Sequence, residues 1–348
     1  MGPSGLIIQA NLNHSARAQD LLVQYLVERG TGLAVVAEPY RVPDHPHWMG
    51  DTSGSAAIYW VGRPGSSACS VIERGWGFLA VDWGGTAVVA IYAPFRRSLE
   101  EFERSLDGVG RCVSRCLPRQ VLVLGDFNAK ATVWRSPGTD TRGREVLEWA
   151  AGLELRLLNT GSVHTCVRHN GGSIVDLSWA TAPAARRITR WRVAEEVETL
   201  SDHRYIVLGL SAAASTPRRR PINEGSPQPR WALKRFDQDA LMAAAHVVAC
   251  PGTPAGSVDG TGEARWFRGA MTSICDVAMP RAKVIPRKAV YWWSRAIADL
   301  RNECVRARRQ YARARRRRRG DDVLAAQLYG RYWEKVIALQ LAIRRAKD

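Results

Sequence analysis

The stretch that most constrains the fold of this chain is Val121-Leu122-Val123-Leu124-Gly125-Asp126-Phe127-Asn128. Four consecutive apolar residues, two of them β-branched, indicate a short strand that is buried on both faces. Gly125 would then let the backbone turn, and Asp126 and Asn128 follow two positions apart. Because residues i and i+2 of an extended segment point to the same side, we expect both polar groups to project together from a core strand. An Asx-rich turn after a strand is the alternative interpretation.

Segments around this strand alternate between strand and helix patterns, which is typical of an α/β domain. Residues 6–13 predict a first strand, residues 15–29 a helix for which Gly30 is a suitable end, and residues 33–37 a second buried strand that leads into Glu38. Further strands are predicted at 56–61, 78–83, 87–93, 174–176 and 205–210, and further helices at 99–116 and 143–152.

The 348 residues can hold one large α/β domain and a smaller second region. Residues 212–230 are rich in Ala, Ser, Pro and Arg and are predicted to be a linker. We therefore divide the chain into a domain at 1–211, the linker at 212–230 and a helical basic region at 231–348. Within that region, helices are expected at 231–248 and 263–279, followed by a basic helical hairpin with Arg315 to Arg319 at its tip.

The positive charge of the chain is concentrated near its end. The net charge is +17, yet residues 1–211 carry 22 Lys or Arg against 21 Asp or Glu, whereas residues 281–348 carry 20 against 6. Such a run indicates a polyanionic partner, above all nucleic acid. A solvated helix face is the alternative interpretation.

Composition also narrows the class of protein. No apolar run approaches the roughly 18 residues of a membrane span, and the chain does not start like a secretory signal. The seven cysteines include no Cys-x-x-Cys pair, and Cys112 and Cys116 lack a second Cys/His pair that would complete a zinc site. We expect an intracellular protein with reduced thiols and no membrane partner.

Polar residues follow the predicted strands, and strand ends on one edge of an α/β sheet are where sites are built. Glu38 with Asn11 and Asp202 would offer the oxygen ligands that Mg²⁺ prefers. A carboxylate such as Asp176 bonded to His203 would fix the imidazole tautomer and support a positive charge on the ring. Phosphodiester hydrolysis needs these parts. Taken singly, Glu38 could be a surface carboxylate and His203 a buried structural histidine.

The ordered set of polar residues resembles the endonuclease/exonuclease/phosphatase superfamily. The residues that carry this resemblance are Asn11, Glu38, Tyr92-Ala93-Pro94, Gly125-Asp126-Phe127-Asn128, Asp176 and Ser201-Asp202-His203. Residues 10–15, 38–40 and 125–130 further resemble the apurinic-like endonuclease domain of non-LTR retrotransposons, especially of arthropod types. The resemblance covers about residues 6–211 and implies a four-layer α/β sandwich of two mixed β-sheets flanked by helices.

The resemblance also implies a metal and a water-activating pair. Glu38 would be the main Mg²⁺ ligand, with Asn11 and Asp202 close to the metal, and Mn²⁺ could substitute for Mg²⁺. Asp126 would orient or deprotonate the attacking water, and Asn128 would position that water and the phosphate. No position in the set departs from the family pattern.

Three more residues would handle the phosphate and the leaving group. His203, paired with Asp176, would bind the scissile phosphate, and Tyr92 would contact the phosphate or assist the leaving group. Further candidates for nucleic-acid contacts are Lys130, Arg135, Arg142, Arg168, Arg315, Arg316, Arg317, Arg318 and Arg319.

Part of the C-terminal region resembles the connector between such an endonuclease and a reverse transcriptase. The matching residues are Tyr291-Trp292-Trp293, Leu300 and Arg306-Ala307-Arg308-Arg309. We expect the polymerase to lie outside this sequence, because Asp321-Asp322 lies in a polar helix break and no Cys-Cys-His-Cys knuckle is seen. We therefore expect a fragment or degenerate copy of a longer element protein, whose basic tail contacts element RNA or packs on the missing polymerase.

The leading hypothesis is a Mg²⁺-dependent DNA endonuclease that acts in the nucleus. It would nick one strand of target DNA and leave a 3′-hydroxyl for target-primed reverse transcription. An abasic-site repair endonuclease and a nucleic-acid-binding remnant without turnover are the alternatives, and binding by such a remnant would weaken steeply with salt. A phosphoesterase for small phosphates fits the basic tail less well. Target preference would come from loops such as 41–55, 132–141 and 165–172.

Overall fold

The computed structural model of the chain describes residues 5–62, 67–169, 171–211, 235–249, 260–279, 290–316 and 322–348. The chain forms two compact units, one of residues 1–216 with 288–348 and one of residues 217–287. The region 231–348, which we expected as one helical segment, is therefore divided between the two units, and the expected linker at 212–230 lies outside the described residues. The second unit contains α5 (Gln238–Ala249) and α6 (Gly260–Ala278).

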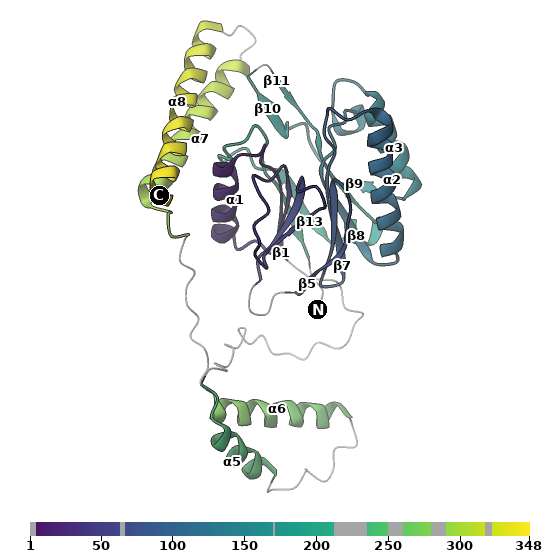
Figure 1. Cartoon of the computed structure of the whole chain (residues 1–348), viewed down its shortest axis with the longest axis vertical. Helices are drawn as coiled ribbons and strands as arrows, with labels where there is room; N and C mark the ends of the chain where they lie inside the picture. Colours follow the sequence, from purple (N-terminus) through teal and green to yellow (C-terminus); the bar gives the residue numbers. More distant parts are fainter. Residues whose placement is uncertain are drawn as a thin grey trace. The chain divides into compact units, whose positions relative to one another are not determined.

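Two six-stranded mixed β-sheets form the centre of the first unit (Figure 1). The first sheet contains, in spatial order, β13 (Ile188–Val193), β14 (Ile206–Leu210), β1 (Gly5–Asn11), β2 (Leu33–Ala37), β4 (Ala56–Trp60) and β3 (Trp48–Gly50). The second contains β5 (Cys69–Arg74), β6 (Phe78–Trp83), β7 (Thr86–Tyr92), β8 (Gln120–Asp126), β12 (Asp176–Ala180) and β9 (Arg156–Leu157). A separate ribbon pairs β10 (Cys166–Arg168) with β11 (Gly171–Ser173). The pairs β1–β2 and β7–β8 are parallel and the others antiparallel.

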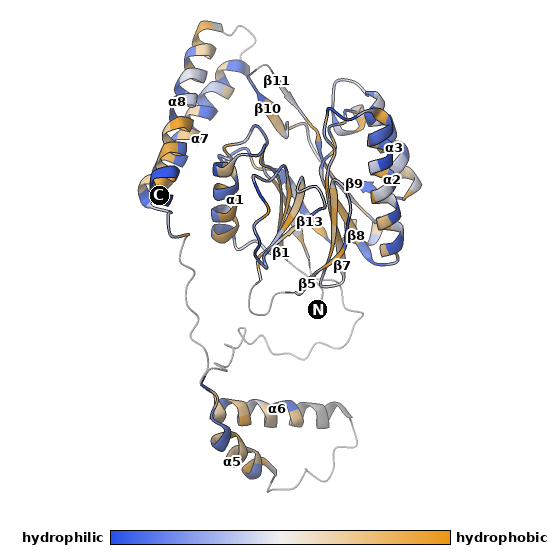
Figure 2. Ribbon diagram, in the orientation of Figure 1, coloured by the Kyte–Doolittle hydropathy of each residue, from blue (hydrophilic) through white to orange (hydrophobic). Residues whose placement is uncertain are grey.

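Alternate residues of the core strands face different layers. Along β8, Val121 and Val123 pack against helices, whereas Leu122 and Leu124 pack against the other sheet. Helices α2 (Leu99–Cys116) and α3 (Thr141–Gly152) cover the second sheet, and α1 (Ala16–Arg29) covers the first. Figure 2 shows apolar residues concentrated in the sheets and polar residues on the outer sides of the helices. The expected four-layer α/β sandwich is confirmed.

Helix ends match their capping residues. Ser15 caps α1 by accepting a hydrogen bond from the Ala18 amide, and Gly30 ends the helix at φ 64°, a conformation that glycine adopts without steric cost. Ser98 and Glu101 form a capping box at the start of α2. Two short elements, the 3-10 turn η1 (Thr132–Trp134) and α4 (Ala182–Ala185), complete the domain.

Gly125 does not turn the backbone, so this detail of our interpretation is wrong. It remains inside β8 at φ 156°, where it pairs with Ile91 and Leu177. A side chain at this position would place its Cβ 1.8 Å from the Ile91 carbonyl oxygen. The glycine is therefore required by the close approach of β7, and the chain turns three residues later at Asn128, whose φ is 46°.

The last two helices pack on the sandwich as an antiparallel pair. They are α7 (Arg295–Arg316) and α8 (Asp322–Lys347), and Glu303 of α7 forms an ion pair with Lys335 of α8 at 2.8 Å. Their apolar residues join the cluster that also contains the inner face of α1; the contributing side chains are Ile297, Cys304, Val336, Leu339 and Ile343. The expected hairpin is thus present, although residues 317–321 at its tip lie outside the described residues. Across the described ranges, the helices are all too short or too polar to cross a membrane.

Candidate active site

Strand pairing brings three of the candidate residues to one edge of the second sheet. Asp126 ends β8, and in register it lies opposite Tyr92 at the end of β7 and Asp176 at the start of β12. On the first sheet, Asn11 ends β1 beside Ala37, the residue that precedes Glu38. The positions of these four side chains along their strands therefore follow from the register of the two sheets.

A buried glutamine joins the two sheets directly beneath this edge. Gln9 of β1 donates from Nε2 to the carbonyl oxygens of Gly125 at 3.0 Å and Leu177 at 3.2 Å, and its Oε1 accepts from the Ser178 hydroxyl at 2.9 Å. Two residues further along β1, Asn11 donates from Nδ2 to Asp126 Oδ2 at 2.9 Å. The two sheets thus contribute to a single polar network.

The Asp126 carboxylate is the centre of that network. It is 1% exposed and accepts three hydrogen bonds, one from Asn11 and two from Asn128, whose backbone N–H and Nδ2 lie 2.9 and 3.1 Å away. Burial raises the pKa of Asp126 above its ordinary value and the nearby Asp176 carboxylate raises it further, while the His203 ring opposes the rise. The proximity expected for Asp126 and Asn128 is present, although the turn at Asn128, not an extended segment, produces it.

His203 and Asp176 form a buried pair. The Nδ1–H of His203 donates to Asp176 Oδ2 at 2.8 Å, and both side chains are at most 5% exposed. Burial alone would lower the pKa of His203, but the charge and hydrogen bond of Asp176 outweigh it and raise that pKa well above its ordinary value. The pair therefore favours a charged imidazolium whose Nε2 is oriented away from Asp176.

Glu38 and Tyr92 form the outer part of the network. The Tyr92 hydroxyl donates to Glu38 Oε1, and His14 Nε2 lies 3.4 Å from the same oxygen. Burial and the hydrogen bond to Glu38 raise the pKa of Tyr92 far above its ordinary value, so the hydroxyl stays protonated. Glu38 has φ 46°, an uncommon conformation for a non-glycine residue and one that clusters at functional sites.

The donor set at this edge fits a hard divalent cation. Two clusters among the described residues place three possible ligand atoms within 4.8 Å of one another: Asp126, Asp176 and His203, and Cys166, Asp202 and His203. Glu38 belongs to neither. Mg²⁺ keeps several waters and takes only one or two protein carboxylates, and Glu38 Oε2 has no hydrogen-bond or ion-pair partner within the described ranges. Glu38 therefore has an oxygen available for such an ion, whereas the Asn11 oxygen accepts from the Asn13 N–H at 2.8 Å, and the metal-binding roles of both residues stay predictions.

Asp202 lies on the far side of His203, where other groups engage it. Its Oδ2 accepts from Arg168 Nε at 2.7 Å, and its Oδ1 lies 3.9 Å from His203 Nε2. A direct place for Asp202 on the same ion as Glu38 stays a prediction. The sequence did not reveal Cys166, whose Sγ is 3.8 Å from Asp202 and whose strand forms a bridge to His203. No signal in the sequence links these two segments.

The basic residues proposed for nucleic-acid contacts differ in their exposure and in the partners that they already have. Lys130 and Arg135 are exposed on the loop between β8 and α3, and Arg168 is exposed but paired with Asp202. Arg142 is engaged, because its guanidinium donates to the carbonyl oxygens of Pro94, Phe95 and Arg97. It therefore holds the loop that follows Tyr92.

The hairpin tip is described only in part. Arg315 is exposed and stacks over the Tyr311 ring, with 5.7 Å between its guanidinium carbon and the ring centre. Its charge, after burial and Arg204, lowers the pKa of His164, which precedes β10. The side chain of Arg316 and residues Arg317, Arg318 and Arg319 lie outside the description.

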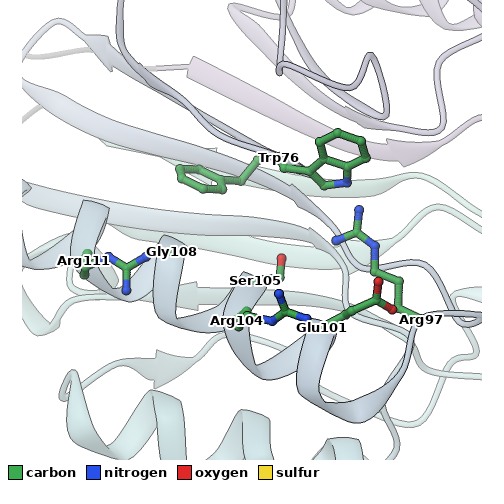
Figure 3. Close-up of a pocket in the computed structure, with 8 residues that line it drawn as sticks. Trp76, Arg97, Glu101, Arg104, Ser105, Gly108 and Arg111 are labelled. Carbon is green, nitrogen blue, oxygen red and sulfur yellow. The ribbon is translucent and has the colours of Figure 1, made fainter.

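A surface pocket of about 490 Å³ lies beside this edge, between the start of β6 and helix α2. Figure 3 shows Trp76 across the pocket from Arg104, Ser105 and Arg111 of α2. Arg97 stacks over the Trp76 ring at 5.7 Å. The residue after Trp76, Gly77, accepts a hydrogen bond from the Tyr92 backbone N–H at 2.9 Å. The backbone beside this aromatic and basic pocket is therefore hydrogen-bonded to the strand end that carries Tyr92.

Comparison with known proteins shows which proteins this chain resembles in sequence and fold. A family model described as endonuclease-reverse transcriptase matches residues 86–207. The endonuclease domain of TRAS1, a telomere-specific non-LTR retrotransposon, superposes with a TM-score of 0.51 and 26% identity over 60% of this chain and 99% of that domain. These similarities indicate a nuclease domain that resembles the endonucleases of non-LTR retrotransposons.

Two other solved structures match at lower scores. A 3′ phosphatase from Neisseria, bound to a product DNA hairpin, and a 3′-5′ exonuclease from Neisseria meningitidis each give a TM-score of 0.47, with 14% and 16% identity. Each match covers 60% of this chain and the whole of the other chain. A search of curated proteins finds no match to this nuclease.

Proposed function

We propose that this nuclease nicks one strand of duplex DNA in a Mg²⁺-dependent reaction and leaves a 3′-hydroxyl. In the nucleus, that hydroxyl would prime reverse transcription of a non-LTR retrotransposon by a polymerase outside this chain. The observation that carries the proposal is the network at the sheet edge, in which Asp126 and the Asp176–His203 pair lie within 4.8 Å of one another and Asn11 joins them.

The residues of the inner network supply the water and the positive charge. Water attacks the phosphorus, and the Asp126 carboxylate, held by Asn11 and Asn128, orients that water and accepts its proton. The bond from phosphorus to the 3′-oxygen breaks, and the 3′-oxygen takes up a proton to become the 3′-hydroxyl. The imidazolium of His203, maintained by Asp176, donates from Nε2 to a phosphate oxygen whose charge grows in the transition state.

The outer residues would hold the cation and orient the phosphate. Glu38 and Asn11 would bind Mg²⁺, and a bound Mg²⁺ supplies neutralisation of the phosphate charge. The protonated hydroxyl of Tyr92 donates to Glu38 Oε1, and we expect it to contact the phosphate beside the end of β7. Because the pKa of Tyr92 is raised, this hydroxyl acts as a donor throughout the neutral range.

Charge and aromatic surface next to Tyr92 favour a polymeric substrate. The pocket beside α2 contains Arg97, Arg104 and Arg111 against one acidic residue, Glu101. A DNA strand that passes the site would meet these guanidinium groups, which can bind its phosphates, and the exposed Trp76 ring, on which its bases can stack. A small phosphate ester would leave this surface unused.

The direct test is a nicking assay with the full chain. Supercoiled plasmid incubated with Mg²⁺ should convert to the open-circular form, and a DNA polymerase should extend the new ends without prior phosphatase treatment, because they carry a 3′-hydroxyl. Chelation of the metal and the His203→Gln variant should each abolish conversion. Intact plasmid at all protein concentrations would overturn the proposal. Cleavage restricted to an abasic oligonucleotide would replace it with abasic-site repair.

A further inference from the structure

One of the contacts between the C-terminal helices and the nuclease domain involves the loop that carries two candidate active-site residues. Residues 194–203 form the loop that carries Asp202 and His203, and Arg308 of α7 reaches into its first half. One nitrogen of the guanidinium, Nη2, donates to the carbonyl oxygens of Glu195 and Val197, each at 2.7 Å. The other, Nη1, lies 3.3 Å from Glu198 Oε2.

Glu198 is the only acidic side chain in this loop that is fully buried, with 1% of its surface exposed. It is held from α8 as well, because the Tyr332 hydroxyl lies 3.3 and 3.4 Å from its two oxygens. A buried carboxylate with an arginine and a tyrosine on it is costly to assemble unless all partners are present. The two helices of the hairpin therefore fix Glu198 together.

From Glu198 the contacts continue to the catalytic histidine. Glu198 Oε1 accepts from the backbone N–H of Leu200 at 3.1 Å, and Leu200 has φ 54°, which a β-branched or bulky residue adopts only when its surroundings enforce it. The adjacent Thr199 hydroxyl donates to the His203 carbonyl oxygen at 2.7 Å. The loop conformation that places His203 over Asp176 is thus held at its base by Glu198.

We infer that Arg308 is a positioning residue for the nuclease reaction: through Glu198 it holds the loop that sets His203, so the C-terminal hairpin is part of the working nuclease. This inference rests on the proposed function for its kinetic consequence. It also gives the hairpin a role that its positive charge alone does not indicate, because Arg308 is committed to the protein and not to nucleic acid.

The same helix provides a matched control. Arg301 of α7 also anchors the hairpin, with its two terminal nitrogens 3.1 and 3.3 Å from the two oxygens of Glu28 on α1. Its exposure of 19% is close to the 15% of Arg308. Arg301 makes a forked contact to a carboxylate, whereas Arg308 contacts the Glu198 carboxylate with one nitrogen and two carbonyl oxygens with the other. Only Arg308 touches the loop that carries His203.

The test compares Arg308→Lys and Arg301→Lys in the full chain. Lysine keeps the charge, so the buried Glu198 is not left without a cation, but it lacks the planar pair of terminal nitrogens with which each arginine makes its contacts. Because small misplacement of a reacting group costs up to about 10²-fold in rate, we expect Arg308→Lys to lower kcat for plasmid nicking by about tenfold with KM nearly unchanged. Arg301→Lys should leave both constants unchanged. Equal kcat values for the two variants would overturn the inference.

Hydrogen exchange supplies a readout that does not depend on catalysis. Amides of residues 195–203 should exchange faster in Arg308→Lys than in the wild type, whereas in Arg301→Lys any faster exchange should be confined to α1 and α7. Unchanged exchange in the loop of Arg308→Lys would also overturn the inference. If the wild type does not nick DNA, the proposed function fails while this measurement still decides whether Arg308 positions the loop.

Discussion

The two halves of the site are held in different ways. The inner half consists of Asp126, Asp176 and His203, which are at most 5% exposed and of which two are placed by paired strands. The outer half consists of Glu38 and Tyr92, and Glu38 is 16% exposed and sits on an irregular backbone at φ 46°. Strand register therefore fixes Asp126 and Asp176, whereas Glu38, the proposed metal ligand, lies on a strained backbone just beyond the end of its strand. Loss of function should therefore respond differently to Mg²⁺ in the two halves. High Mg²⁺ should not restore the rate after a substitution in the inner half, but it should restore part of the rate after one in the outer half.

The largest effect is expected in the inner half, at Asp126. Asp126→Asn keeps the shape of the side chain but removes the proton acceptor, so nicking should fall by about 10³-fold, within the range of general base catalysis. The half-saturating Mg²⁺ concentration should stay near that of the wild type, because Asp126 is not the proposed metal ligand. Single-turnover nicking across a Mg²⁺ titration measures both quantities. If high Mg²⁺ restored the rate of Asp126→Asn, Asp126 would also contribute to metal binding, and the division of the site into two halves would be wrong.

A smaller effect, of about 10²-fold in rate, is expected from Asp176→Asn, which removes the group that keeps His203 charged. The wild-type rate should fall at alkaline pH as His203 loses its proton, at a pH above the ordinary histidine pKa. Without Asp176, that alkaline limb should move to lower pH. A pH–rate profile of both proteins tests the shift, and identical alkaline limbs would contradict the assigned role of the pair.

The free energy of unfolding should depend on pH through the same Asp176–His203 pair, in a direction that the raised pKa of His203 determines. A histidine whose pKa is raised by folding contributes stability that is complete below its unfolded pKa of about 6.5 and is lost as the pH rises through its folded pKa. The free energy of unfolding of the wild type should therefore exceed that of Asp176→Asn most at acidic pH, by about 3 kcal/mol for a broken buried pair. Urea denaturation at several pH values measures the difference. A gap that widens with pH would refute this sign.

The smallest effect is expected in the outer half, at Tyr92. Tyr92→Phe removes one hydrogen bond to a charged group, which contributes about 1.5–3 kcal/mol, and we expect about a tenfold loss at low Mg²⁺. Because the hydroxyl orients Glu38, high Mg²⁺ should recover part of the rate. Nicking rates at low and saturating Mg²⁺ test this, and a loss that is independent of Mg²⁺ would place Tyr92 with the inner half.

Local patterns predicted the sandwich well, because the apolar run or capping residues that indicate each core strand or helix lie in or next to that element. The run Val121 to Leu124 indicated a strand buried on both faces, and Ser15 and Gly30 marked the ends of α1. The need for Gly125 could not be read in the same way, because the atom that excludes a side chain there belongs to Ile91 of another strand. Weakly patterned edge elements such as β3, β9 and β13 were also missed.

The candidate site was predictable as a set of residues but not as a geometry. The resemblance identified Asp126, Asp176 and His203, and the structure brings them together. It gave no means to find that Arg142 is engaged by three carbonyl oxygens or that Cys166 lies beside His203. Likewise, the sequence predicted a basic helical hairpin, whereas the docking of α7 on the domain depends on Glu28 and Glu198, far away in sequence.

The most direct test of the two-part site measures metal binding and nicking in the same preparations. Mn²⁺ binding, followed by electron paramagnetic resonance, should weaken by about 10²-fold or more in Glu38→Gln, the loss expected when a carboxylate ligand leaves a site of one or two carboxylates. In Asp126→Asn it should stay close to the wild type, and both variants should nick plasmid far more slowly than the wild type. Mn²⁺ bound equally well by Glu38→Gln and the wild type would contradict the account.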